Sequence, residues 1–338
     1  MAEPKVSVII PTLVAGPRLE QCLRGLGAQT LTGFETIVVD NSGCGAAAAL
    51  ARDAGARLIE NRANAGFGAA VNQGIAAAGG EFICTLNDDA TPDPRWLEEL
   101  TAACGADPAI GMGASQIRLA GEPEKLDSAG LAIYLDGSSK QRGRMRPAAA
   151  YTAAEEVLLP SACAALYRAA MLREIGSFDP DFFLYCEDTD LGLRARRAGW
   201  RCVYVPAAVV YHAYSASAGR ASLQKMFHVE RNRIYLIIKN FPFWVWPLTP
   251  LFTMYRYVVH LWGLATGRGL AWEFHQENEG WWRLVIIVLS ANYQALVKLP
   301  AMLGKRRQAA KTARLSGWAF WRLLRRHSIS ARALALEQ

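Results

Sequence analysis

Short apolar runs alternate with amphipathic stretches from residue 5 to about residue 103. Four of the runs are rich in β-branched residues and bounded by turn residues, which is typical of buried strands. The four predicted strands comprise residues 6–10, 35–40, 56–61 and 81–87. Leu19, Cys22, Leu23 and Leu26 follow helical spacing, and residues 69–78 form an alanine-rich helix candidate. This alternation predicts right-handed crossovers and a mostly parallel sheet.

The rest of the chain divides into three stretches. Residues 120–150 are rich in glycine, serine and charge, which predicts a surface excursion. Residues 160–212 regain an ordered pattern, with a helix at 187–198 and a strand at 201–205. Beyond residue 221 long apolar and aromatic segments alternate with basic ones. The sequence therefore predicts an α/β domain over residues 1–220 and a helical C-terminal region over residues 221–338.

Composition narrows the class of protein. With 338 residues, of which 52% are hydrophobic and 20% charged, the chain is a folded protein rather than a disordered one. Its seven cysteines are scattered and form no C-x-x-C pair, which argues against a disulfide framework and a structural zinc site. A reducing cytosol is the simplest setting for this cysteine usage. The N-terminus has no basic stretch followed by a long apolar core, so we expect no signal peptide.

Charge separates the two predicted regions. Residues 1–220 contain 20 basic and 25 acidic residues, whereas residues 221–338 contain 17 basic and 5 acidic residues and eight of the ten tryptophans. Basic residues interleaved with tryptophan suit an anionic membrane surface or nucleic acid. Residues 243–262 reach the length of about 20 residues that spans a bilayer but contain Arg256, His260 and two prolines. The pattern favours interfacial helices, with a helical homo-oligomer surface as the alternative.

The candidate catalytic and metal-binding residues lie at the ends of predicted strands and at the start of one predicted helix. Asn87, Asp88 and Asp89 follow an apolar run, where they suit either Mg²⁺ or Mn²⁺ or an ordinary turn. Glu187 and Asp188 precede an amphipathic helix, where they suit either capping or a general base of raised pKa. His212 suits either a structural hydrogen bond or a metal ligand. The glycine-rich residues 64–74 match neither G-x-G-x-x-G nor a P-loop.

Six motifs together resemble a known family. VSVIIPT, IVVDNSG, NAGFGAAVNQG, LNDDA, GSFDPDFFLYCEDTDLGLRARRAGW and VVYH follow the order and spacing of the family 2 glycosyltransferases. These are inverting enzymes with a GT-A fold, which is built on a mostly parallel Rossmann-like sheet. Within the family, the motifs look most like those of bacterial rhamnosyltransferase-like members that build cell-surface polysaccharides. The resemblance spans residues 6 to about 217.

The resemblance implies roles for individual residues. Pro11, Thr12 and Asp40 match positions that hold the nucleoside of the donor, and Asn64, Asn72 and Asp88 match positions near that donor. Asn87 and Asp89 match the first and last positions of the metal-binding D-x-D motif, and His212 matches a metal ligand of related members. Asp188 matches the catalytic base, with Glu187 beside it in the acceptor site. Asn87 departs from the motif and removes one negative charge from the site.

The resemblance therefore implies an inverting transferase that uses Mn²⁺ or Mg²⁺ and a nucleoside-diphosphate sugar. From the resemblance alone, we expect dTDP-rhamnose as the donor and a polyprenyl-linked glycan as the acceptor. We expect a peripheral or monotopic protein on the cytoplasmic face of the inner membrane, with its C-terminal helices associated with the membrane. The alternatives are a catalytically silent nucleotide-sugar-binding subunit and a nucleic-acid-binding protein. The acidic balance of residues 1–220 makes nucleic acid the least favoured partner.

Overall fold

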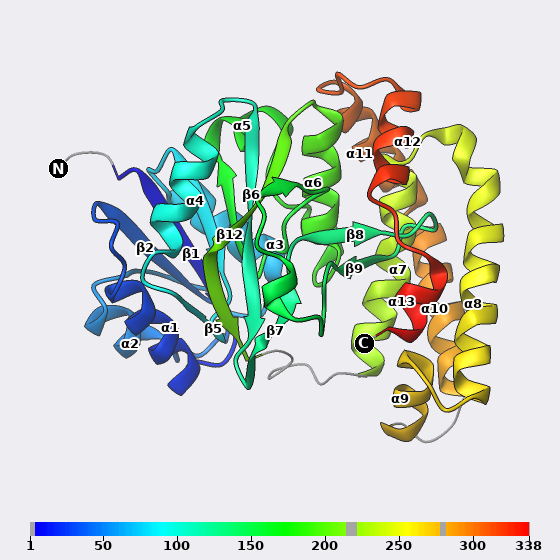
Figure 1. The fold of residues 1–338 in the computed structure, drawn as a ribbon, viewed down its shortest axis with the longest axis horizontal. Coiled ribbons are helices and arrows are strands. Elements are labelled where there is room, and N and C mark those ends of the chain that lie inside the picture. The colour runs from blue at the N-terminus through cyan, green and yellow to red at the C-terminus, as the bar shows by residue number, and fades with distance from the viewer. Residues whose placement is uncertain (1–3, 214–221, 278–281, 338) are drawn as a thin grey trace. The chain divides into compact units, whose positions relative to one another are not determined.

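The computed structural model describes residues 4–213, 222–277 and 282–337 (Figure 1). The chain forms two compact units. The first contains residues 1–131 and 141–217, and the second contains residues 132–140 and 218–338. The second unit therefore includes a segment that the sequence prediction assigned to the first region.

A mixed sheet forms the centre of the first unit, and ten strands belong to it among the described residues. Its main path runs β10-β12-β6-β11-β4-β1-β2-β3, with β5 paired to β12 and β7 paired to β6. The parallel half comprises β1 (Val6–Thr12), β2 (Phe34–Asp40), β3 (Arg57–Glu60) and β4 (Phe82–Leu86). The other strands are β5 (Ala90–Pro92), β6 (Ile110–Leu119), β7 (Glu122–Ser128), β10 (Glu155–Glu156), β11 (Ala164–Arg168) and β12 (Arg201–His212).

Helices cover both faces of this sheet. One face packs against α1 (Pro17–Gly27) and α4 (Trp96–Gly105), and α2 (Ala48–Asp53) adds Ala51 to the same cluster. The other face packs against α3 (Phe67–Ala77), α5 (Ala169–Ile175) and α6 (Glu187–Arg197). Short 3₁₀ turns, η1 (Ala148–Ala150) and η2 (Pro180–Phe182), complete the unit. Because strand side chains alternate, Val8 and Ile10 of β1 point to the first face and Ile9 to the second.

The structure confirms the four predicted strands, both early helices and the helix at 187–197. The strand predicted at 201–205 continues to His212, with a register irregularity between Val205 and Val209. The predicted surface excursion over 120–150 is wrong, because this segment forms β7 and the hairpin of β8 (Leu131–Ile133) and β9 (Ser139–Gln141), much of it buried. The polar side chains of this segment can be buried because they form hydrogen bonds and ion pairs, as described below for Asp127 and Asp136.

Helices build the second unit around the hairpin segment 132–140. In chain order they are α7 (Leu223–Asn240), η3 (Phe243–Leu248), α8 (Thr249–Ala265), α9 (Leu270–Glu277), α10 (Trp282–Val297), α11 (Leu299–Ala310), α12 (Gly317–Arg326) and α13 (Ala331–Leu336). Within the described residues, no helix on its own has the length and apolar character to cross a membrane. By length and composition the pair α10 and α11, bent by 61° at their junction, meets that requirement together.

Four buried charges join the hairpin to α7 and α8. Arg256 of α8 donates from Nε to Asp136 Oδ2 at 2.7 Å and approaches Glu230 Oε1 of α7 with Nη1 at 2.8 Å. Arg233 Nε donates to Glu230 Oε2 at 2.8 Å. Burial would raise the pKa of both carboxyl groups, but Arg256 and Arg233 hold the pKa of Asp136 and of Glu230 below their ordinary values. Two positive and two negative charges therefore compensate one another inside the second unit.

Glu230→Gln is expected to destabilise the second unit by about 3–5 kcal/mol, because it leaves buried arginine charge without a partner. Chemical denaturation followed by circular dichroism measures this loss. Glu20→Gln, which removes an exposed carboxylate paired with Arg24 on α1, serves as the control and should change the free energy of unfolding by less than about 1 kcal/mol. An equal effect of the two substitutions would contradict the role given to the buried charges.

The same cluster predicts a dependence of stability on pH. The pKa values of Asp136 and Glu230 are lower in the folded protein than in the unfolded chain, so their contribution is complete above the unfolded values of about 4. It is lost as the pH falls from there towards the folded-state values. We expect the acid-induced loss of stability to be smaller in Glu230→Gln, which melting curves at several acidic pH values would show.

Candidate active site

Polar side chains gather where β1 and β4 end, at the carboxyl edge of the parallel strands. Thr12 at the end of β1 donates its hydroxyl to Asp88 Oδ2 at 2.6 Å, and Asp88 lies in the turn that follows β4. Burial and the charge of Asp89 outweigh this hydrogen bond and raise the pKa of Asp88 to about 6. The adjacent Asn41 N–H donates to Thr12 O at 2.7 Å, which ties the end of β2 to the same edge.

A histidine joins two carboxylates beside this turn. His212, the last residue of β12, lies with Nε2 3.1 Å from Asp89 Oδ1 and Nδ1 2.8 Å from Asp127 Oδ2 of β7. Arg144 in turn makes an ion pair with the other oxygen of Asp127. Burial would lower the pKa of His212, but its contacts with Cys163, Asp127 and Asp89 raise the pKa well above the ordinary value. His212 pairs with Ala90 where β12 lies against β5, and this pairing places His212 beside Asp89, the residue before Ala90.

Asp89 and His212 are suited to a divalent cation once the imidazole has released its Nε2 proton. A ligating histidine commonly has a carboxylate on its other ring nitrogen, and Asp127 occupies that position here. Carboxylate oxygen and imidazole are both ligands that Mn²⁺ accepts. The described part of the chain nevertheless groups no three His, Cys, Asp or Glu side chains that could hold a metal by themselves. Asp89 and His212 alone would therefore need further oxygen ligands to hold a cation.

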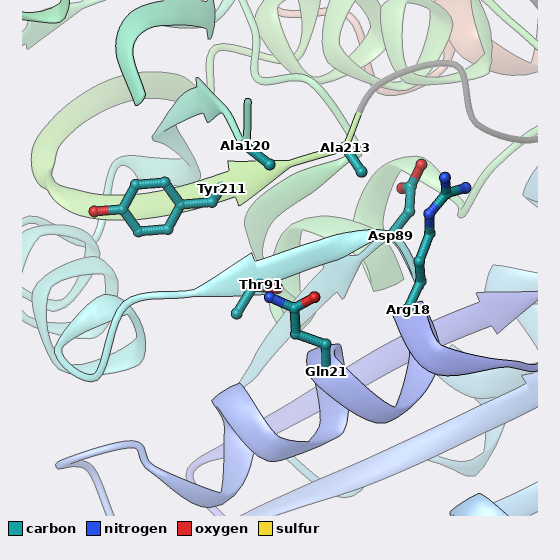
Figure 2. A pocket seen from close by; sticks show the side chains of 7 residues that line it. All are labelled: Arg18, Gln21, Asp89, Thr91, Ala120, Tyr211 and Ala213. Atoms are coloured by element: carbon teal, nitrogen blue, oxygen red, sulfur yellow. The ribbon is translucent and has the colours of Figure 1, made fainter. Parts of the chain in front are cut away.

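A pocket of about 260 Å³ opens beside Asp89 (Figure 2). Arg18 and Gln21 of α1 line it together with Thr91 of β5 and Tyr211 of β12. Figure 2 shows the guanidinium of Arg18 on the same side of the pocket as the Asp89 carboxylate. Burial would raise the pKa of Asp89, but the hydrogen bond from His212 and the positive charge of Arg18 keep it below its ordinary value. Asp89 is therefore ionised at neutral pH.

Glu187 and Asp188 form the first turn of α6 and follow an unusual backbone. Phe183, Tyr185 and Cys186 all have positive φ, a conformation that costs a non-glycine residue about 1–2 kcal/mol. Glu187 is buried, and its Oε2 has no hydrogen-bond partner among the described residues. Burial raises the pKa of Asp188, and burial together with Asp188 raises the pKa of Glu187. The pair therefore binds a proton more readily than isolated carboxylates.

The Asp188 carboxylate is anchored to the segment that also touches the Asn87 turn. Its Oδ2 accepts the Ala162 N–H at 3.3 Å, and the next residue, Cys163, accepts the Asn87 N–H at its carbonyl at 2.8 Å. Residues 162 and 163 therefore bring the acidic start of α6 and the turn after β4 to one place. Asp190, in contrast, is fully buried in an ion pair with Arg194 at 2.9 Å, which is a structural role.

Three of the residues assigned to donor binding have backbone partners. Asp40 is buried and accepts the N–H groups of Ser42 and Ala47 at 2.9 and 2.8 Å. Asn72 exchanges two hydrogen bonds with the backbone of Phe178, at 2.8 and 3.0 Å. Asn64 Oδ1 accepts the Gly66 N–H at 2.9 Å. These contacts shape the loops around the site. Pro11 lies partly exposed in β1, one residue before Thr12.

The sequence prediction did not include Asp127, Arg144 or Arg18. Asp127 and Arg144 lie in the segment taken for a surface excursion, and neither belongs to a motif. Arg18 lies on the helix after β1, where an arginine is an ordinary exposed residue in sequence terms. The pairing of β7 with β6 and of β12 with both β5 and β6 shows that Asp127 and Arg144 belong to the site. Arg18 is placed there by the packing of α1 beside the pocket.

Comparison with known proteins identifies the class. Residues 7–176 match the family model of "Glycosyl transferase family 2", and residues 149–304 match that of "Glycosyl transferase family group 2". The chain belongs to glycosyltransferase family 2 and has an α/β GT-A-like fold, as the six motifs implied. It is a glycosyltransferase.

The relatives include an N-acetylglucosaminyl-diphospho-decaprenol L-rhamnosyltransferase of Mycobacterium tuberculosis, 29% identical over 71% of this chain and 87% of its own. Two solved structures share the fold. GalNAc-T7 with UDP, GalNAc and Mn²⁺ has a TM-score of 0.57 at 16% identity, covering 70% of this chain and 48% of that one. A mannosyltransferase of Pyrobaculum calidifontis with GDP-Man and Mn²⁺ has a TM-score of 0.51 at 18% identity, covering 91% and 86%.

Gly66 offers a test of how the loop before α6 is held. A Cβ at Gly66 would lie 2.5 Å from Phe183 O, whereas Gly33, also at positive φ, has open space around it. Both alanine substitutions carry the penalty of about 1–2 kcal/mol for positive φ. Gly66→Ala should cost clearly more in denaturant unfolding and should also reduce sugar transfer, which Gly33→Ala should leave unchanged. Equal losses of stability in the two variants would show that the close approach to Phe183 is unimportant.

Proposed function

We propose that this glycosyltransferase transfers a sugar, with inversion, from a nucleoside-diphosphate sugar to a polyprenyl-linked glycan. The observation that carries the proposal is the convergence of Asp188 and the Asn87–Asp89 turn on residues 162 and 163. This convergence supports the proposal because a single displacement needs a proton acceptor close to the place where the charged leaving group is bound.

Asp188 is suited to the role of base. Asp188 is half-buried, and its carboxylate is oriented by the N–H groups of Ala162 and Thr189. In the proposed reaction the acceptor hydroxyl gives its proton to Asp188, its oxygen bonds to the anomeric carbon, and the bond from that carbon to the diphosphate breaks. The raised pKa of Asp188 strengthens it as a proton acceptor once ionised. Glu187, whose pKa is raised by burial and by the neighbouring Asp188, is proposed to contact the acceptor.

The diphosphate end of the donor belongs at the turn after β4. Asp89 and His212 would hold Mn²⁺ or Mg²⁺, which when bound neutralises charge on the leaving diphosphate. Asp127 keeps the His212 ring oriented, and Asn87 adds an amide oxygen to the same turn. Thr12, Asp88 and the Asp40 loop are proposed to border the nucleoside. Asn64 and Asn72 act through the loops that they hold.

The sugar and the acceptor are proposed from likeness to the rhamnosyltransferase of Mycobacterium tuberculosis, whose name specifies a decaprenyl-diphosphate-linked acceptor. We propose dTDP-rhamnose as the donor and place the protein at the cytoplasmic face of the inner membrane, where a lipid-linked acceptor would be available. A screen of nucleotide sugars for release of nucleoside diphosphate, with and without a polyprenyl-diphosphate-linked acceptor, tests both. If the screen detected transfer from another nucleotide sugar and none from dTDP-rhamnose, the proposed donor would be wrong, whereas the proposed type of reaction would stand.

Asp188→Asn is expected to lower the rate of transfer about 10²-fold or more, with donor affinity little changed, because the amide cannot take the proton. Asp53→Asn, at an exposed position of α2, is the matched control and should transfer at the parent rate. The parent enzyme should gain activity as the pH rises through the raised pKa of the acidic pair, because only the ionised carboxylate accepts a proton. Asp188→Asn should lose this rise, and its persistence would assign the base elsewhere.

Asp89→Asn and Asp127→Asn are expected to weaken metal-dependent binding of the nucleoside diphosphate. For Asp127→Asn, which changes only the residue that orients His212, we expect about a 10–100-fold loss of Mn²⁺ affinity. Calorimetric titration with Mn²⁺, Mg²⁺ and excess chelator measures both, with Asp53→Asn again as the control. Unaltered binding and full activity in chelator would remove the cation from the proposal.

A further inference from the structure

Helix α8 has its polar and apolar sides reversed relative to a helix that faces water. Its inward side places Arg256 in the cluster with Asp136 and Glu230. Its outward side carries Leu251, Met254, Tyr255, Val258 and Leu261, each between 54 and 67% exposed. These positions recur every three or four residues, so they form one continuous apolar stripe. A stripe of this length on a water-facing helix marks a binding surface.

Helix α10 repeats the pattern. Its inward side buries the small residues Ala291 and Ala295. Its outward side carries Val285, Ile286, Leu289, Tyr293 and Leu296, each between 46 and 70% exposed. Gln294 accepts a hydrogen bond from Arg231 of α7 at 2.7 Å, so the polar contact of this helix again lies on its inner side.

The charge of residues 221–338 decides whether a second copy of the chain or a lipid surface covers these two apolar faces. Residues 221–338 contain 17 basic and 5 acidic residues, and one of the acids, Glu230, is buried among arginines. Lys298, Arg307 and Lys311 are exposed on and beside α11, directly after α10. Two copies of so basic a surface repel each other, whereas anionic lipid headgroups attract it. Exposed aromatic side chains such as Tyr255 and Tyr293 are typical of the membrane interface.

We infer that the outward faces of α8 and α10 insert into the boundary between headgroups and acyl chains of an anionic bilayer. The exposed basic residues Lys298, Arg307 and Lys311 then lie at the level of the headgroups. This inference extends the proposed function, because a lipid-linked acceptor lies in that bilayer. It depends on the surface of the second unit alone and is tested without sugar transfer.

The test is flotation of the full chain with vesicles of phosphatidylcholine, with and without phosphatidylglycerol. We expect binding to the anionic vesicles, weaker binding to neutral ones, and only partial release by high salt, because salt screens the headgroup attraction and leaves the apolar burial intact. Recovery of the protein in the unbound fraction with anionic vesicles would overturn the inference.

Two triple variants test the faces. Met254→Gln, Val258→Gln and Leu261→Gln change the α8 stripe, and Ile286→Gln, Leu289→Gln and Leu296→Gln change the α10 stripe. Glutamine keeps the helix propensity, and all six side chains are exposed, so circular dichroism and the melting temperature should match those of the parent. Each triple variant should lower the partition coefficient at least about tenfold. Leu270→Gln, an exposed leucine on α9, is the control.

A second copy of the chain is the competing occupant. Analytical ultracentrifugation without lipid should give a monomer for the parent and for both triple variants. An oligomer that the triple variants dissociate, combined with unchanged vesicle binding, would overturn the inference in favour of a subunit interface. Transfer to a water-soluble, short-chain acceptor measures the proposed function separately, so a parent enzyme that transfers sugar but does not bind anionic vesicles would reject only the membrane surface.

Discussion

Both ring nitrogens of His212 face a carboxylate, Asp89 on one side and Asp127 on the other, and the geometry of the candidate active site depends on this contact. It requires β12 to continue seven residues beyond its predicted end, β7 to fold back on β6, and the turn after β4 to present Asp89. A buried imidazole held between two acids is stable only when all three segments are in place, because either carboxylate left unpaired would be costly to bury. The site is therefore a property of the finished sheet rather than of one loop.

The sequence predicted the parallel half of the sheet well because its signal is local. Runs such as residues 6–10 and 37–40 are buried on both faces, so their mainly apolar character shows without knowledge of their neighbours. The segment 120–150 gave the opposite impression for an equally physical reason. Asp127 and Asp136 are among its buried residues, and their partners, His212 and Arg256, lie 85 and 120 residues away along the chain. Composition cannot distinguish a solvated charge from one whose partner arrives by folding.

The candidate site shows the same division. Motif order singled out Asp89, His212, Glu187 and Asp188, and the structure connects them through strand pairing and through residues 162 and 163. The motifs do not separate residues that face a substrate from residues that hold the backbone. Asp40 and Asn72 have their polar atoms in hydrogen bonds to main-chain groups, so what the structure shows for them is that they fix the loops beside the candidate site. Roles of this kind appear only when each buried donor and acceptor is traced to its partner.

The buried charges also explain how α8 can turn apolar side chains outward. A helix with an arginine on its inner side would ordinarily rotate to bring that charge to water, because an unpaired buried guanidinium is strongly unfavourable. Asp136 of the hairpin segment 132–140 and Glu230 of α7 together compensate the charges of Arg256 and Arg233. With its charge paired, Arg256 can stay buried, and α8 does not need to rotate. Once the inner side is neutral, the rotation of the helix is set by the ion pairs, and the stripe from Leu251 to Leu261 is held at the surface. The inserted hairpin therefore determines which face of α8 is available for binding.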